Sequence, residues 1–189
     1  MLHTSRLLLR PWREQDIPGM AAMNADPRVM EHFPSKLTAA ESEAMVGRLQ
    51  EHFAKNDFGL WVVEAVGVAD FVGFVGLSVP KFESHFTPCF EVGWRLLYEH
   101  WGRGFATEAA QVALAFGFEQ RKLDQIVSFT IPANQRSRRV MERLGMTRSP
   151  ADDFEHPSLA PGHPMRQHVL YRLTRSDWDR RSSGQIVGA

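Results

Sequence analysis

One stretch near the middle of the chain joins a short strand pattern to a helix pattern through two glycines. The strand pattern is Glu91–Leu96, and Gly102 and Gly104 stand just before a run of good helix formers that starts at Ala106. Glycine has no Cβ, so a ligand can approach its backbone closely. The first N–H groups of a helix lack internal partners, and the macrodipole adds partial positive charge there. The stretch therefore predicts an anion-binding loop, most naturally for phosphate.

Two common phosphate-binding loops do not fit these residues. A nucleotide-triphosphate loop requires Gly-Lys-Ser or Gly-Lys-Thr, and no lysine follows Gly104. A dinucleotide fingerprint requires a glycine or alanine three residues after Gly104, where this chain has Thr107. A third pattern, Gln/Arg-x-x-Gly-x-Gly/Ala, matches at Gly104 and Ala106, while Trp101 departs from it at the first position.

This third pattern resembles the pyrophosphate loop of the GNAT superfamily of acetyl-CoA-dependent N-acetyltransferases. The run Trp-Gly-x-Gly-aromatic-Ala-Thr-Glu-Ala, from Trp101 to Ala109, resembles the branch that contains the ribosomal-protein N-terminal acetyltransferases. The opening Thr-x-Arg-Leu-x-Leu-Arg, from Thr4 to Arg10, is also similar to the start of many members of that branch.

A second motif follows about 30 residues later in the order typical of GNAT proteins. It consists of Asn134 and Ser137, followed by Glu-Arg-Leu-Gly-Met over residues 142–146. Two motifs in the right order are far more specific than either alone, and the resemblance extends from Ser5 to about Leu173. It implies a single-domain α/β fold of the GNAT type, with a central, mixed and mostly antiparallel twisted sheet flanked by helices.

The local patterns agree with this fold and predict its elements. At 189 residues the chain can bury one sizeable core, so we expect one N-acetyltransferase domain over residues 1–189 with a core at about 5–174. Asp16 is a candidate helix cap, and Thr38 with Glu41 forms a capping box before a second helix. The expected strands are 5–12, 59–66, 70–79, 89–97, 125–131 and 169–173; the expected later helices follow Gly104 and Asn134; the expected loops are 80–88 and 147–167.

Composition limits the function further. Lys plus Arg and Asp plus Glu both number 22, and this balance argues against a dedicated nucleic-acid binder. The single Cys89 excludes an internal disulfide and suits a reducing compartment. No apolar run approaches the ~20 residues that span a bilayer, and the N-terminus lacks an apolar signal core. We expect a cytoplasmic monomer or homodimer that does not bind membranes.

The resemblance implies the chemistry of the site. A neutral amine attacks the thioester of acetyl-CoA, and a base or an ordered water path accepts its proton. Glu91 matches the strand glutamate proposed as the base in the ribosomal-protein branch; the alternative is a solvated or paired carboxylate. A backbone N–H of the strand Glu91–Leu96 is the candidate oxyanion donor. Many GNAT proteins protonate the departing thiolate with a helix tyrosine, but Met141 holds that position here, so Ser137 is the substitute.

The resemblance also implies which residues hold acetyl-CoA, the only cosubstrate expected besides an amine acceptor. Asn134 would bond the pantetheine amide, or serve purely as a helix cap, or do both. The other expected cofactor-binding residues are Trp94, Leu96, Gly102, Arg103, Gly104, Phe105, Ala106 and Thr107.

Several residues have two interpretations. The two N-terminal helices are either a wall of the acceptor site or plain scaffold. Cys89 could form an acyl-enzyme, although a buried structural thiol is the simpler interpretation. The histidines of the 147–167 tail and His168 lack a cysteine or a His-x-x-x-His helix, so we expect no metal. The acidic cluster of that tail is a candidate for attracting a cationic acceptor.

Two rival functions remain beside acetyl transfer. A catalytically silent acyl-CoA-binding module would bind the cofactor without turnover. An RNA-associated protein would use the basic face between Arg136 and Arg143 and would bind with steep salt dependence. The sequence leaves the acceptor open among a protein N-terminus, an aminoglycoside, a polyamine and an amino acid.

Overall fold

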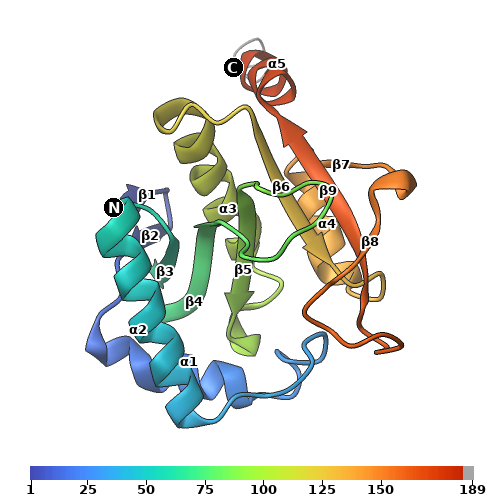
Figure 1. Cartoon of the computed structure of the whole chain (residues 1–189). Helices are drawn as coiled ribbons and strands as arrows, with labels where there is room; N and C mark the ends of the chain where they lie inside the picture. Colours follow the sequence, from blue (N-terminus) through green and yellow to red (C-terminus); the bar gives the residue numbers. More distant parts are fainter. Residues whose placement is uncertain (185–189) are drawn as a thin grey trace. The chain divides into compact units, whose positions relative to one another are not determined.

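The computed structural model describes residues 1–184, which form two compact units (Figure 1). The first unit contains Met1–Ser78 and Gly93–Ala113. The second contains Val79–Val92 and the chain from Leu114 onwards. The chain passes from one to the other inside strand β5 (Glu91–Leu96) and inside helix α3 (Phe105–Ala115).

The first unit is built on an antiparallel meander. Each strand pairs with the next one along the chain, and the last of the four adjoins β5, where the Leu97 amide donates to the Val72 carbonyl over 2.9 Å. The expected pair 59–66 and 70–79 is confirmed as β3 and β4. The four strands are β1 (Leu2–His3), β2 (Leu7–Arg10), β3 (Leu60–Ala65) and β4 (Ala69–Ser78).

Two helices of this unit lie beside each other in Figure 1: α1 (Ile17–Ala25) and α2 (Ala39–Asn56). The predicted capping box begins α2, because the Thr38 hydroxyl accepts from the Glu41 amide and the Glu41 carboxylate accepts from the Thr38 amide. Their shared core with β3 and β4 includes Trp12, Met20, Met23, Val46, Val62 and Phe74.

Asp16 occupies the N-cap position of α1 as predicted, but its side chain makes no capping hydrogen bond. Its carboxylate instead accepts two hydrogen bonds of 2.8 Å from the guanidinium of Arg10, which is fully buried. A bidentate, charge-assisted pair is stronger than a neutral capping bond, and a buried arginine cannot be left without a carboxylate at low cost. Glu64 also accepts from Arg10, at 3.0 Å.

The second unit is built around β9 (Gln167–Thr174), which runs antiparallel to β6 (Gln125–Thr130). On the other side of β6, Glu91 of β5 pairs in parallel with Val127. The tail 147–167 was expected to be a loop, and this is wrong in two places. β7 (Thr147–Arg148) and β8 (Phe154–Glu155) both pair with β9. Strands of two residues are too short to show alternation, so sequence patterning misses them.

Three α-helices follow the glycine loop in the described part of the chain. α3 continues into a π-helix at Phe116–Gln120, in which Phe116 is half-buried and Phe118 is fully buried. Helix α4 (Gln135–Arg143) starts after Asn134 as predicted. Helix α5 (Arg175–Gly184), for which no expectation was made, places Trp178 on Phe118 with ring centroids 5.4 Å apart.

These elements confirm the predicted α/β class with a mixed, mostly antiparallel set of strands. The β5–β6 ladder is parallel, and the other registered ladders are antiparallel. Within residues 1–184, no helix is both long enough and apolar enough to cross a bilayer.

Candidate active site

The glycine loop before α3 leaves space in front of its backbone. Gly102 and Gly104 have φ angles of +75° and +81°, a region that side chains rarely adopt. A Cβ built on Gly102 would meet nothing within 4 Å, and one on Gly104 would meet only Nη2 of Arg6, at 3.5 Å. The loop therefore opens the start of α3 to an anion, as the sequence predicts.

Trp101 stands where the GNAT pattern has Gln or Arg, and it has a structural role in this position. Its indole N–H donates to the carbonyl of Leu96 over 2.9 Å, and its ring packs on Tyr98 with centroids 5.1 Å apart. This bond joins the end of β5 to the start of the loop across a short 3₁₀ turn, Tyr98–His100. The tryptophan thus fixes the position of the loop relative to the strand.

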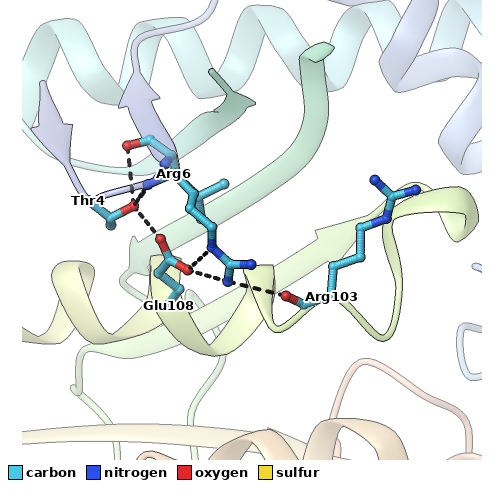
Figure 2. A network of polar contacts seen from close by, with 5 residues as sticks. Thr4, Arg6, Arg103 and Glu108 are labelled. Atoms are coloured by element: carbon cyan, nitrogen blue, oxygen red, sulfur yellow. Dashed lines mark hydrogen bonds and ion pairs between the residues drawn. The ribbon is translucent and has the colours of Figure 1, made fainter. Parts of the chain in front are cut away.

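A polar network holds the loop from its other side (Figure 2). Arg6 donates to the Glu108 carboxylate from Nε at 2.9 Å and from Nη2 at 2.5 Å, and Nη2 also donates to the Arg103 carbonyl at 3.2 Å. The Thr4 hydroxyl donates to the other Glu108 oxygen at 2.5 Å. We call Thr4, Arg6 and Glu108 the loop brace. The Arg103 side chain points away from Glu108 in Figure 2, so only its carbonyl takes part in the network.

The loop brace is charged at neutral pH. Partial burial would raise the pKa of Glu108, but the hydrogen bonds from Arg6 and Thr4 outweigh it and lower the pKa below its ordinary value. Because the carboxylate is stabilised in the folded state, its contribution is present above the ordinary glutamate pKa. It is lost only as the pH falls through the lowered value.

Glu108→Gln is expected to raise the KM for acetyl-CoA about fivefold and to leave kcat nearly unchanged, since a partly exposed ion pair contributes at most about 1 kcal/mol. Initial-rate kinetics with varied acetyl-CoA would test this. Glu119→Gln is the matched control, because Glu119 is exposed near the end of the same helical run. An equal KM in all three proteins would exclude a bracing role.

Asn134 and Ser137 lie together at the start of α4 in the second unit. The Asn134 carboxamide oxygen accepts from the Ser137 amide at 3.1 Å, which confirms the predicted cap. The Asn134 amide group donates to the Thr130 hydroxyl at 3.0 Å. Ser137 is half-buried, and among residues 1–184 its hydroxyl forms no hydrogen bond. Ser137 therefore presents a hydroxyl that is available to a ligand.

Glu91 and Cys89 are close neighbours in the second unit, where β5 begins. Glu91 is half-buried. Burial first, and the charge of Glu91 second, raise the pKa of the Cys89 thiol to about 11. At neutral pH the thiol is therefore protonated and a poor nucleophile.

Cys89→Ala is expected to keep most of the activity, since a thiol held neutral cannot easily attack a thioester. Mass spectrometry of the parent protein with acetyl-CoA and no acceptor should find no acetylated Cys89. A stable adduct on Cys89 that passes its acetyl group to an added amine would overturn direct transfer.

The expected site residues divide between the two units. The first unit holds the expected cofactor-binding residues of the strand and the loop, with Leu96 and Phe105 buried and Trp94 half-buried; they are Trp94, Leu96, Gly102, Arg103, Gly104, Phe105, Ala106 and Thr107. The second unit holds Glu91, Asn134 and Ser137. Sequence reasoning left Thr4, Arg6 and Glu108 out of the site, although all three belong to the quoted motifs.

The tail does not present the free acidic cluster that was expected to attract a cationic acceptor. Asp152 accepts from Arg172 at 2.8 Å, and Glu155 accepts from Arg166 at 2.8 Å. Asp153 is paired with Arg148. His156 and His168 face each other with ring centroids 5.1 Å apart inside a phenylalanine cluster. Across the described part of the chain, no group of three or more His, Cys, Asp or Glu is arranged to hold a metal ion.

The glycine loop fits the pyrophosphate of a coenzyme A thioester. It offers backbone N–H groups, the positive end of a helix and unfilled space at Gly102 and Gly104. An open loop of this kind in an α/β fold of mostly antiparallel strands is compatible with the class of acyl-CoA-dependent transferases.

The chain belongs to the GNAT acetyltransferase family. The family described as "Acetyltransferase (GNAT) domain" matches residues 6–147. The protein is accordingly an acetyl-CoA-dependent N-acetyltransferase.

Two comparisons support this assignment, and a third shows the fold alone. The chain is 31% identical to the FsC-acetyl coenzyme A-N(2)-transacetylase of Aspergillus fumigatus, over 95% of this chain and 78% of that protein. It is 26% identical to the acetyltransferase (GNAT family) from Bacillus anthracis, with a TM-score of 0.76 over 93% of this chain and 98% of that one. The ribosomal-protein-S5-alanine acetyltransferase from Vibrio fischeri shares the fold, with 20% identity, a TM-score of 0.72 and coverage of 93% and 97%.

Proposed function

We propose that this enzyme transfers the acetyl group of acetyl-CoA directly to a primary amine, without an acyl-enzyme. The observation that carries the proposal is the open and braced glycine loop at the start of α3. The high pKa of Cys89 supports direct attack, since it leaves the thiol neutral. The lone cysteine also supports our proposal of a cytoplasmic location.

In this proposal the chain supplies groups for three tasks. Backbone N–H groups at Gly104 and the start of α3 bind the pyrophosphate. Glu91 accepts the proton of the attacking amine, directly or through water, and a backbone N–H of β5 stabilises the oxyanion. Ser137 donates a hydrogen bond to the departing thiolate, and Asn134 keeps Ser137 at the first turn of α4.

We also propose that the cofactor loop binds acetyl-CoA in the way typical of the ribosomal-protein N-terminal acetyltransferase branch. The support is the loop brace, since its Thr-x-Arg and Glu belong to the two sequence motifs on which the resemblance to that branch rests. The proposal concerns the cofactor loop, and the acceptor is a separate question. The oligomeric state, monomer or homodimer, stays a prediction.

Acetyl-CoA-dependent thiol release with a panel of amines tests the proposal. The panel contains amino acids, polyamines, an aminoglycoside and short peptides with free N-termini. We expect turnover with at least one amine, and Glu91→Gln should lower kcat more at low pH than at high pH, where the amine is already neutral. Tight acetyl-CoA binding without turnover on any amine would favour the silent binding module. RNA binding that weakens steeply with salt would favour the second rival.

A further inference from the structure

Arg95 of β5 is an unusual arginine of the first unit. Its Nη1 donates to the Asn24 carboxamide oxygen at 2.5 Å, and its guanidinium carbon lies 4.0 Å from the Phe33 ring centroid and 5.5 Å from that of Phe74. Its Nε is buried and, within residues 1–184, has no hydrogen-bond partner. No carboxylate of the described chain pairs with it.

The amide that contacts Arg95 is held in a fixed orientation. Asn24 is fully buried in α1, and its amide nitrogen donates to the Ser42 hydroxyl of α2 at 3.0 Å. This bond directs the carboxamide oxygen towards Arg95. The two phenylalanine rings restrict the guanidinium plane. Arg95 is therefore positioned in advance by both N-terminal helices and by the segment between them.

An arginine in this position costs folding free energy. Burial alone lowers the pKa of Arg95 to about 10, because no anion compensates it. Arg10 of the same unit shows the contrast, since Asp16 and Glu64 neutralise it. A half-buried guanidinium with a buried, unpaired Nε and no counter-ion in the described chain marks a candidate ligand site.

We propose that Arg95 is an anion-binding residue of the acceptor site, and that the acceptor is a small primary amine that carries a carboxylate. This inference rests on the proposed function and names its substrate class. Arg95 is held by α1 and α2. The sequence allows two interpretations of these helices, and one of them is a wall of the acceptor site. A guanidinium fork matches a carboxylate in a bidentate manner. Nη1 of Arg95 is bonded to Asn24, and Nε, unpaired within residues 1–184, is a donor of the right kind.

The same charge discriminates against other amines. A polyamine would bring a second cation towards Arg95, and the two like charges would repel each other. An amino acid brings one amine and one carboxylate. Its anion neutralises Arg95, and its amine remains for acetylation.

Matched acceptor pairs test the inference. Each amino acid is compared with its carboxamide, ornithine is compared with putrescine, and lysine with cadaverine, so that each pair differs in the carboxylate. For the preferred pair, kcat/KM should be roughly 10- to 100-fold higher for the acid, as expected for a charge-assisted bidentate contact. Rates are compared at equal concentrations of neutral amine.

Arg95→Gln should remove this preference, and Arg95→Lys should restore only part of it, because an ammonium lacks the planar fork. Arg28→Gln is the control, since Arg28 also stacks on a ring, that of Tyr98 at 3.9 Å, but is paired with Asp26. It should keep the preference. Arg95→Met should change the Tm little, because it removes an uncompensated charge but leaves the buried carboxamide oxygen of Asn24 without its donor.

The outcomes separate this inference from the function on which it rests. Equal kcat/KM for acids and their amides, an acid preference that survives in Arg95→Gln, or turnover of polyamines alone would overturn it. A Tm that falls by several degrees in Arg95→Met with the preference unchanged would make Arg95 a structural residue. If acetyl-CoA binds and other amines are acetylated but no amino acid is, only the inference fails. If acetyl-CoA does not bind, the proposed function fails.

Discussion

Gly104→Val is expected to abolish acetyl-CoA binding while the protein stays folded. The isopropyl group would occupy the space in front of the loop, where a Cβ would meet only the end of the Arg6 side chain. It would keep the pyrophosphate from the first N–H groups of α3, and losing several charge-assisted hydrogen bonds lowers affinity by at least ~100-fold. Calorimetry with acetyl-CoA measures the loss directly.

The effect of backbone strain in Gly104→Val must be distinguished from the effect of blocking the loop. Gly67→Val is the control, because it introduces the same strain away from the loop. Gly67 also has a positive φ, +71°, a Cβ placed on it would meet nothing within 4 Å, and it lies in the turn between β3 and β4. Valine at either position should cost about 1–2 kcal/mol from the left-handed backbone. Gly67→Val should still bind acetyl-CoA. Unchanged affinity in a folded Gly104→Val protein would remove the loop from the cofactor site.

Ser137→Ala is expected to lower kcat by about 100-fold and to leave acetyl-CoA affinity nearly unchanged. A thiol with a pKa near ~8.5 leaves as a thiolate without a strong acid, so the loss of the hydroxyl should fall at the low end of the ~10²–10⁴-fold range for general acid catalysis. The contact strengthens only as charge develops on sulfur, which is why binding is spared. Single-turnover kinetics would show whether the measured rate is that of the acetyl-transfer step.

Two variants control this result. Ser137→Cys should retain part of the activity, because a thiol can also donate a hydrogen bond. Met141→Tyr in the Ser137→Ala background would supply the phenol that other GNAT proteins use, but Met141 is buried, with 1% exposure, and a larger ring there would overpack the core. We therefore expect no rescue. Parental turnover by Ser137→Ala, with chemistry rate-limiting, would mean that solvent protonates the thiolate.

Local rules predict the elements whose signals lie within a few residues of each other. The capping box of Thr38 and Glu41, the cap by Asn134 and the β3–β4 pair all follow from adjacent residues and are present. The glycine loop belongs to this group, because positive φ angles and an open helix start depend on the loop's own residues. The π-helix at Phe116–Gln120 and the two-residue strands could not be predicted in this way, since neither has a local sequence pattern.

The sequence by itself thus determined the family, the cofactor loop and the order of most elements, because those depend on local propensities and short spacings. Tertiary structure alone decided which charges are compensated. Arg6 pairs with Glu108, 102 residues further along the chain, and the Asp16 carboxylate binds the buried Arg10. Arg95 bonds to Asn24, 71 residues away, and pairs with no carboxylate of residues 1–184. Burial and pairing of a charge depend on which distant segments pack around it, and no short stretch of sequence encodes that.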